Sequence, residues 1–143
     1  EGRGKGFSVN CGWGELGYGD VEYNYWLDEL IMPIGRLFDP TLVLVSAGFD
    51  SGAGDEEGFF VTPTGYASLL SKLKTLAGGR VVVELEGGYN IPAISYGLHS
   101  CLAELLDLVE REEGEGKKVN EGAVGDVQAA IDAQRPFWKC FQE

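Results

Sequence analysis

Two short, mostly apolar runs constrain this sequence most. They are residues Leu42–Val45 and Val81–Leu85. Runs of this length, bounded by turn residues, are typical of strands covered on both faces in a parallel sheet. Parallel strands need a helical crossover between them, and an amphipathic segment stands in that place. The pattern therefore predicts an α/β fold with a mostly parallel sheet.

Apolar residues at three-and-four spacing predict the helices around these strands. The first helix covers Val21–Phe38, with Asp20 as its N-cap and a kink at Pro33. The remaining predictions are a helix that starts at Thr62-Pro63 and stops at Gly78-Gly79, one from about Pro92 to Glu110, and one from about Val124 to Pro136. The alternating segment Phe7–Cys11 predicts a further strand.

These elements predict three layers, a sheet with helices on both faces. We expect residues 1–110 to form the main part, 111–122 a charged loop or linker, and 123–143 a closing helix and domain end. The chain starts at Glu1 without an initiator methionine, which suggests a cut within a longer protein.

Charge and composition narrow the function classes. The 143 residues include 11 Lys+Arg and 23 Asp+Glu, a net charge of −12. This acid excess argues against binding to nucleic acid or to an anionic membrane surface. No apolar run approaches the roughly 18 residues of a membrane span. The three cysteines form no CxxC pair, which favours a reducing compartment.

Chemically capable side chains follow both apolar strands. Asp50 comes after Gly48, and Tyr89 comes after Gly87 and Gly88. The carboxyl ends of parallel strands meet at one edge of a sheet, where sites of α/β proteins form. An aspartate at a strand end is more often a turn or cap residue, however, and a Gly-Gly-Tyr sequence is often a tight turn. The pattern alone leaves both interpretations open.

An ordered series of motifs adds a family resemblance. The sequence resembles the C-terminal part of a histone deacetylase domain, of the class II (Hda1-like) branch, over about residues 2–105. The motifs are Gly6–Asn10, Met32-Pro33-Ile34, Val45–Asp50 (Val-Ser-Ala-Gly-Phe-Asp), Gly54-Asp55, Val61-Thr62-Pro63 with Gly65-Tyr66, Leu76–Arg80 (Leu-Ala-Gly-Gly-Arg), Glu84–Asn90 (Glu-Leu-Glu-Gly-Gly-Tyr-Asn) and the closing Pro136-Phe137-Trp138.

The resemblance implies an arginase-like α/β fold and a zinc ion that serves in the hydrolysis of acetyl-lysine amides. Asp50 matches one of the family's zinc ligands, and Tyr89 matches its catalytic tyrosine, a hydrogen-bond donor to the substrate carbonyl. Class IIa members of animals carry histidine in place of this tyrosine, so Tyr89 points to the fully active type. Gly87 and Gly88 match the wall of the acyl tunnel. Phe7 matches a residue that binds a structural potassium ion through its backbone.

Other residues of the family's site are not in this chain. The paired general-base histidines and the Asp-x-His zinc ligands lie upstream of the matched segments, and His99 is the only histidine. The spacing places His99 within a helix, where it is expected to be a surface or core residue. A single carboxylate, Asp50, binds zinc very weakly. The chain alone is therefore expected to be inactive.

Three functions remain open at this stage. The first is a zinc-dependent deacetylase of lysine-rich proteins such as histones, in nucleus or cytoplasm. The second is an acetylpolyamine deacetylase, because Glu57 falls where that branch carries an acidic residue that attracts a cationic substrate. The third is a truncated, non-catalytic deacetylase-like domain. The sequence identifies no complex partner.

Overall fold

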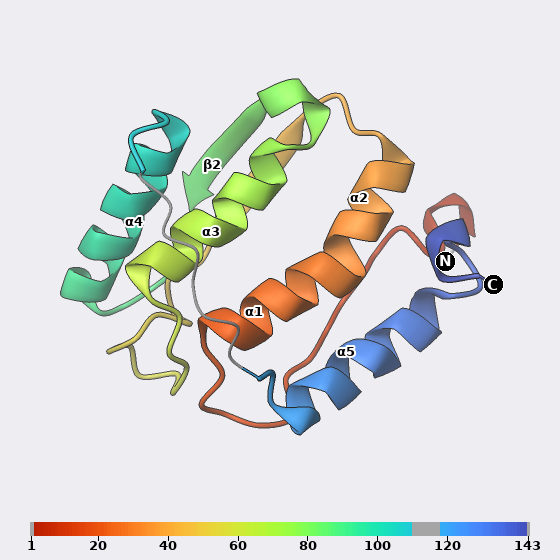
Figure 1. The fold of residues 1–143 in the computed structure, drawn as a ribbon, viewed down its shortest axis with the longest axis horizontal. Helices are drawn as coiled ribbons and strands as arrows, with labels where there is room; N and C mark the ends of the chain where they lie inside the picture. Colours follow the sequence, from red (N-terminus) through yellow and green to blue (C-terminus); the bar gives the residue numbers. More distant parts are fainter. Residues whose placement is uncertain (1, 110–117, 143) are drawn as a thin grey trace.

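The computed structural model describes residues 2–109 and 118–142 and contains a parallel pair of strands with helices packed against it (Figure 1). Strand β1 pairs with β2 in a register that runs from Val43↔Val81 to Ala47↔Leu85. The longer elements are α1 (Asp20–Trp26), η2 (Leu27–Ile31), α2 (Met32–Phe38), β1 (Val43–Ala47), α3 (Pro63–Lys74), β2 (Val81–Leu85), α4 (Ile91–Leu105) and α5 (Glu121–Gln134). Short 3₁₀ turns are η1 (Gly2–Gly4), η3 (Ala77–Gly79) and η4 (Lys139–Phe141).

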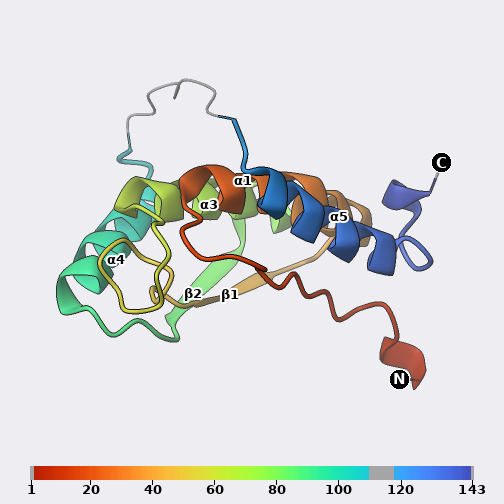
Figure 2. The ribbon, with the colours of Figure 1, turned by 90° about the horizontal axis from the view of Figure 1, so that it is seen from below.

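The two faces of the sheet differ. One face packs against Phe49, Leu70 and Cys101 in a shared apolar cluster. Figure 2 shows α1, α3 and α5 together on one side of the strands. On the opposite face, Leu44 is 73% exposed and Val82 is 53% exposed. The predicted α/β fold with a parallel sheet is confirmed, and the described part of the chain covers one of its two faces.

Side-chain caps determine where the helices begin. Thr62 Oγ1 accepts a hydrogen bond from the Gly65 N–H at 3.0 Å and starts α3, as predicted. Asn90 Oδ1 accepts from the Ala93 N–H at 3.0 Å and starts α4. Asn120 caps α5 in the same way, so this helix begins three residues before the predicted start at Val124. Helix α4 ends at Leu105, so the predicted end at about Glu110 is wrong; the chain leaves the helix through Asp107, which has a positive φ of 56°.

Two N-terminal predictions are wrong. The segment Phe7–Cys11 is not a strand. Its alternation reflects packing, because Val9 and Cys11 contact an apolar cluster that α5 shares with η2 and α2. Asp20 is the first residue of α1 and not its N-cap. Its carboxylate instead accepts hydrogen bonds from the Thr62 N–H at 2.7 Å and the Thr62 hydroxyl at 2.6 Å, which ties α1 to the start of α3.

The first helical segment is irregular just before Pro33. Residues Leu27–Ile31 form a π-helical turn, and the Met32 N–H donates to the Leu27 carbonyl. Proline has no N–H to donate within a helix, so a local change of the hydrogen-bond pattern accommodates it. The helix continues through Phe38 as α2.

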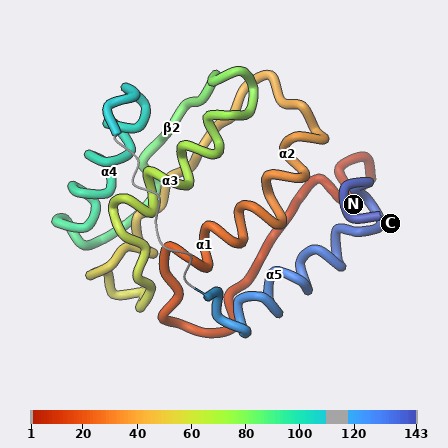
Figure 3. The backbone as a smooth tube through the Cα atoms, viewed as in Figure 1, coloured from red at the N-terminus to blue at the C-terminus, as the bar shows by residue number. Residues whose placement is uncertain are grey.

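The C-terminal helix belongs to the same compact body. Buried residues of α5 pack with buried residues of η2 and α2 and with Trp138, and Trp138 Nε1 donates to the Gly6 carbonyl at 2.8 Å. Figure 3 shows the segment that precedes α1 running alongside α5, where Val9 and Cys11 contact this cluster. The predicted linker falls largely on residues 110–117, outside the described residues. No helix within residues 2–109 and 118–142 has the length and apolar character needed to cross a membrane.

Candidate active site

The loops that follow β1 and β2 are held together by main-chain hydrogen bonds. The Glu86 N–H donates to the Ala47 carbonyl at 3.0 Å, and the Phe49 N–H donates to the Gly87 carbonyl at 3.0 Å. These bonds extend the parallel pairing beyond the strands. Asp50 and Gly87 therefore lie side by side: a Cβ atom on Gly87 would be 3.6 Å from Asp50 Oδ2.

Asp50 is half-buried and oriented by its neighbours. Its Oδ1 accepts a hydrogen bond from the Ser51 N–H at 3.1 Å, and its Oδ2 lies on the Gly87 side. Phe49, the preceding residue, is fully buried and anchors this loop in the core. The Tyr23 hydroxyl donates to Ser51 Oγ at 2.8 Å. Burial raises the pKa of Tyr23, and the negative charge of Asp50 adds to this rise.

Tyr89 projects from the second loop. Its side chain is 79% exposed. The backbone before it turns through positive φ angles of 136° at Gly87 and 107° at Gly88, where a side chain is strained. A Cβ on Gly88 would also lie 2.9 Å from Ile94 and 3.0 Å from Phe49. Glycine is therefore required at Gly88 by conformation and by space.

Glu57 is exposed on the segment between β1 and α3 that also carries Asp55. Asp55 accepts hydrogen bonds from the backbone N–H groups of Tyr89 at 2.8 Å and Asn90 at 2.9 Å. The loop that carries Glu57 is thus attached to the loop that carries Tyr89. The structure brings Asp50, Gly87, Gly88 and Tyr89 to one sheet edge, with the Glu57 loop bonded to it.

Phe7 lies apart from this group. Its ring contacts Phe38 and Trp138, with centroid separations of 6.2 and 5.4 Å. The role of its backbone in potassium binding stays a prediction.

Asp50 is the described residue for which the resemblance implies zinc binding. Among the described residues no group of three His, Cys, Asp or Glu side chains could hold a metal ion. Asp50 fits a zinc site as a single carboxylate ligand, because its Oδ2 lies beside Gly87, which carries no side chain; it cannot form the site alone. His99 is exposed on α4, as expected of a surface histidine.

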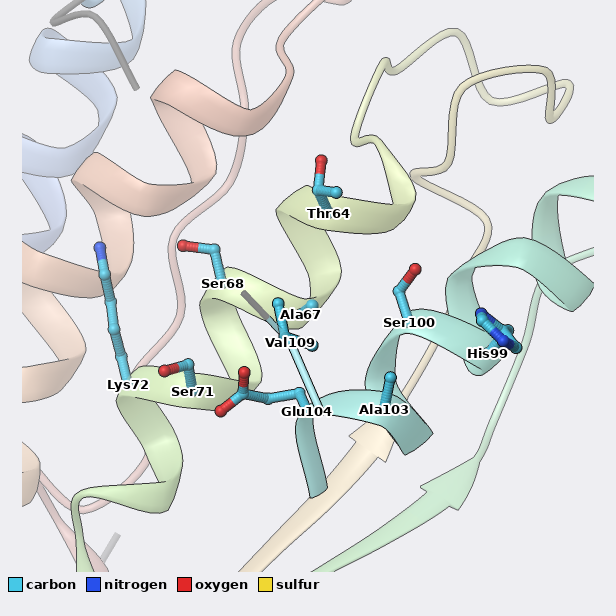
Figure 4. A pocket seen from close by; sticks show the side chains of 10 residues that line it. All are labelled: Thr64, Ala67, Ser68, Ser71, Lys72, His99, Ser100, Ala103, Glu104 and Val109. Carbon is cyan, nitrogen blue, oxygen red and sulfur yellow. The ribbon is translucent and has the colours of Figure 1, made fainter. Parts of the chain in front are cut away.

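His99 lines a different cavity, of about 590 Å³, between α3 and α4. Figure 4 shows this cavity lined by side chains of both helices, including Ser68, Ser71 and Glu104. Neither Asp50 nor Tyr89 is among its lining residues. It is therefore separate from the candidate active site.

Two supporting interactions were not predicted from the sequence. Asp55 belongs to the Gly-Asp motif of the family resemblance, but nothing in the sequence indicates which groups its carboxylate binds. The hydrogen bond from Tyr23 to Ser51 joins residues 28 positions apart, so no local sequence pattern indicates it. The one signal in the sequence is that Asp55, an aspartate, directly follows a glycine in the loop after β1, where a carboxylate can accept hydrogen bonds from nearby backbone N–H groups.

Comparison with known proteins shows the family of this chain. The family model described as "Histone deacetylase domain" matches residues 1–105. The chain is 39% identical to human "Polyamine deacetylase HDAC10" and 38% identical to "Histone deacetylase HDA1" of Saccharomyces cerevisiae. Each match covers 99% of this chain, which spans only 21% and 20% of these relatives.

A solved structure, "Structure of the histone deacetylase Clr3", superposes with a TM-score of 0.93 at 37% identity, over 99% of this chain and 24% of that one. "Crystal Structure of HDA15 HD domain" superposes with a TM-score of 0.88 at 34% identity, over 95% of this chain and 38% of that one. The chain belongs to the histone deacetylase family, in its class II (Hda1-like) branch.

Proposed function

We propose that this chain is part of a zinc-dependent lysine deacetylase that hydrolyses acetyl-lysine amides in proteins such as histones. The observation that carries the proposal is the juxtaposition of a carboxylate, a glycine wall and an exposed tyrosine where two paired parallel strands end. A carboxylate ligand and a hydroxyl donor are groups that serve metal-assisted amide hydrolysis, the first by holding the metal and the second by stabilising the oxyanion. The family relationship supports the same reaction class.

Each residue has a distinct role in this proposal. Bound zinc would polarise the acetyl carbonyl and activate a water molecule. Asp50 contributes one ligand and offsets part of the metal's charge. The Tyr89 hydroxyl donates a hydrogen bond to the carbonyl oxygen as negative charge develops there, which is worth on the order of 10²–10³ in rate at comparable sites. Gly87 adds no side chain beside Asp50 and so leaves room there for the acyl-lysine chain, and Gly88 lets the tunnel wall pack closely against Ile94 and Phe49.

The remaining zinc ligands and the general base would come from residues that this chain does not contain. The isolated 143-residue chain is accordingly expected to bind no stoichiometric zinc and to show no turnover. The full-length protein that contains it is expected to bind zinc and deacetylate peptides. Elemental analysis measures the zinc content of the isolated chain and of the full-length protein, and a fluorogenic acetyl-lysine assay measures their turnover. Stoichiometric zinc in the isolated chain would contradict the proposed division of ligands.

Two substitutions in the full-length protein separate the roles. Asp50→Asn should lower both zinc content and activity, whereas Tyr89→Phe should keep zinc and lower kcat on the order of 10²–10³. Tyr96→Phe is the matched control, because Tyr96 is also exposed, at 66%, seven residues farther along the chain. Full activity of Tyr89→Phe would rule out the proposed oxyanion donor.

A second candidate, acetylpolyamine deacetylation, rests on the exposed carboxylate of Glu57 beside the site. A cationic substrate would be attracted to this charge, and one of the relatives is named a polyamine deacetylase. Glu57→Leu should lower kcat/KM for N8-acetylspermidine relative to an acetyl-lysine peptide. Glu56→Leu, the exposed neighbour, should leave the ratio unchanged. An unchanged ratio in Glu57→Leu excludes this candidate.

The third candidate is a non-catalytic, truncated domain. Full-length protein that lacks both zinc and turnover would favour it. If the protein is a deacetylase, we propose nucleus or cytoplasm as its location, and lysine-rich proteins as partners because of the net charge of −12. Fluorescence microscopy of the tagged full-length protein tests the location.

A further inference from the structure

The carboxylate of Asp55 joins the two strand-end loops. Its Oδ2 accepts the N–H of Tyr89 at 2.8 Å and the N–H of Asn90 at 2.9 Å. Asn90 forms a second link between the loops, because its Nδ2 donates a hydrogen bond to the Gly54 carbonyl at 2.7 Å. These three bonds span 34 to 36 residues of sequence. Asp55 and Asn90 thus form a reciprocal clamp between the loops.

The clamp also reaches into α4. The side-chain oxygen of Asn90 caps this helix through the Ala93 N–H at 3.0 Å. A 15-residue helix is therefore connected to the loop that carries Asp55. Tyr89 lies between the helix on one side and the two positive-φ glycines, Gly87 and Gly88, on the other.

Tyr89 needs such an anchor. Its side chain is 79% exposed, and no hydrogen bond of its hydroxyl is found among the described residues. Two preceding glycines give the backbone more conformational freedom than any other residues would. The location of the hydroxyl then depends on how firmly the backbone of Tyr89 is held, and the bond to Asp55 acts directly on that backbone.

We propose that Asp55 is a positioning residue for the deacetylation reaction: it fixes the backbone of Tyr89 so that the hydroxyl meets the substrate carbonyl. The inference rests on the proposed function of Tyr89. Hydrogen bonds from N–H groups to a charged carboxylate are among the stronger ones in proteins, and 2.8–2.9 Å is within their usual range. The bond from the Tyr89 N–H is the largest cause that lowers the pKa of Asp55, which keeps the carboxylate charged at neutral pH.

The first test measures the clamp without using activity. Hydrogen–deuterium exchange of the full-length protein, resolved by mass spectrometry to residues 86–91, reports on the amides of Tyr89 and Asn90. Asp55→Ala should accelerate their exchange by about tenfold or more, because both amides lose a charged acceptor. Asp55→Asn, which keeps the shape and one acceptor oxygen, should give a smaller acceleration. Glu56→Gln should give none. Unchanged exchange in Asp55→Ala would overturn the proposal.

The second test asks whether Asp55 acts through Tyr89. Asp55→Asn should lower kcat about 10- to 100-fold, with KM changed less than about threefold and zinc content unchanged, because misplacement of a reacting group costs rate. In a Tyr89→Phe background, Asp55→Asn should cause little further loss, since the group that it positions is already absent. Multiplied losses in the double variant would show a general structural role and refute positioning.

Failure of the proposed role of Tyr89 and failure of the proposed role of Asp55 give different results. If Tyr89→Phe retains full activity, the proposed role of the tyrosine is wrong and the kinetic part of this inference falls with it. The exchange data would still decide whether Asp55 holds the loop. If Tyr89→Phe is inactive while Asp55→Asn is fully active, the proposed function stands and positioning by Asp55 is refuted.

Discussion

The substitution Gly97→Ala should destabilise the protein, although alanine is the better helix former. Gly97 is buried within α4 and faces the ring of Phe49. A Cβ atom at this position would lie 2.6 and 2.8 Å from two ring carbons, and real Cβ contacts are essentially never this close. Phe49 cannot simply move away, because its ring is fully buried and packs against the Tyr66 ring at an interplanar angle of 56°, with a centroid separation of 4.8 Å.

The magnitude follows from two opposed effects. Replacement of glycine by alanine within a helix stabilises by about 0.5–1 kcal/mol. Overpacking of a well-filled core costs about 1–3 kcal/mol. The expected result for Gly97→Ala is a net loss of up to about 2 kcal/mol in the free energy of unfolding. Gly125→Ala is the matched control, since Gly125 lies within α5 with no atom within 4 Å of its would-be Cβ.

Urea denaturation of the two variants and the parent protein gives the required comparison. The helix-propensity gain is common to both substitutions, so the difference between their unfolding free energies isolates the clash, at about 1–3 kcal/mol. Gly125→Ala should raise the urea midpoint and Gly97→Ala should lower it. Phe49→Leu combined with Gly97→Ala should be less destabilised than the two single losses added together. Equal stabilisation by both alanines would refute the packing argument.

Three further predictions concern buried groups. Tyr66→Phe should be neutral or stabilising, because the buried Tyr66 hydroxyl has no hydrogen-bond partner among the residues that the structure describes. Burial also raises the pKa of Tyr66 above its value in the unfolded chain, which is about 10. The parent protein should therefore lose stability as the pH rises above about 10, and Tyr66→Phe should lose less. Urea midpoints measured as a function of pH make this comparison. Burial raises the pKa of Cys101 to about 11, so mass spectrometry should show iodoacetamide labelling of exposed Cys140 well before Cys101. Gly65→Ala should lower the thermal midpoint, because its Cβ would overlap the carboxylate of Asp20.

The elements with local signals could be predicted from the sequence. The apolar run after Asp39-Pro40 became β1, and Val81–Leu85 became β2 with the predicted bounds. The start of α3 follows from Thr62, whose hydroxyl caps the helix. Apolar periodicity and caps act over a few residues, so a sequence shows them directly.

The predictions that were wrong depended on distant partners. The alternation in Phe7–Cys11 is compatible with a strand, yet a strand needs a neighbouring backbone, and this segment instead packs its side chains against α5. Asp20 precedes a helical run and has the chemistry of a cap. Its carboxylate binds Thr62, 42 residues away, and no local pattern indicated that choice.

The sequence predicts at which edge of the sheet the candidate site lies, but not the hydrogen bonds that hold its residues in place. Parallel strands place their carboxyl ends together, which gave the neighbourhood of Asp50 and Tyr89. The clamp from Asp55 depends on which loop oxygen meets which N–H. That choice is made by loop geometry, including positive φ angles at Gly54 and Gly88, and not by residue type alone.

Phe49 connects the core to the candidate site, which gives the glycines around it a common explanation. Its N–H donates to the Gly87 carbonyl, and its ring or backbone lies within 3.1 Å of the would-be Cβ atoms of Gly88 and Gly97. Asp50 is the next residue in the chain. A side chain at any of these glycines would displace Phe49 or strain its neighbour, and so would move Asp50. Stability and site geometry are therefore coupled here, and Gly97→Ala should disturb the loop of Asp50 even though Gly97 itself lies within α4.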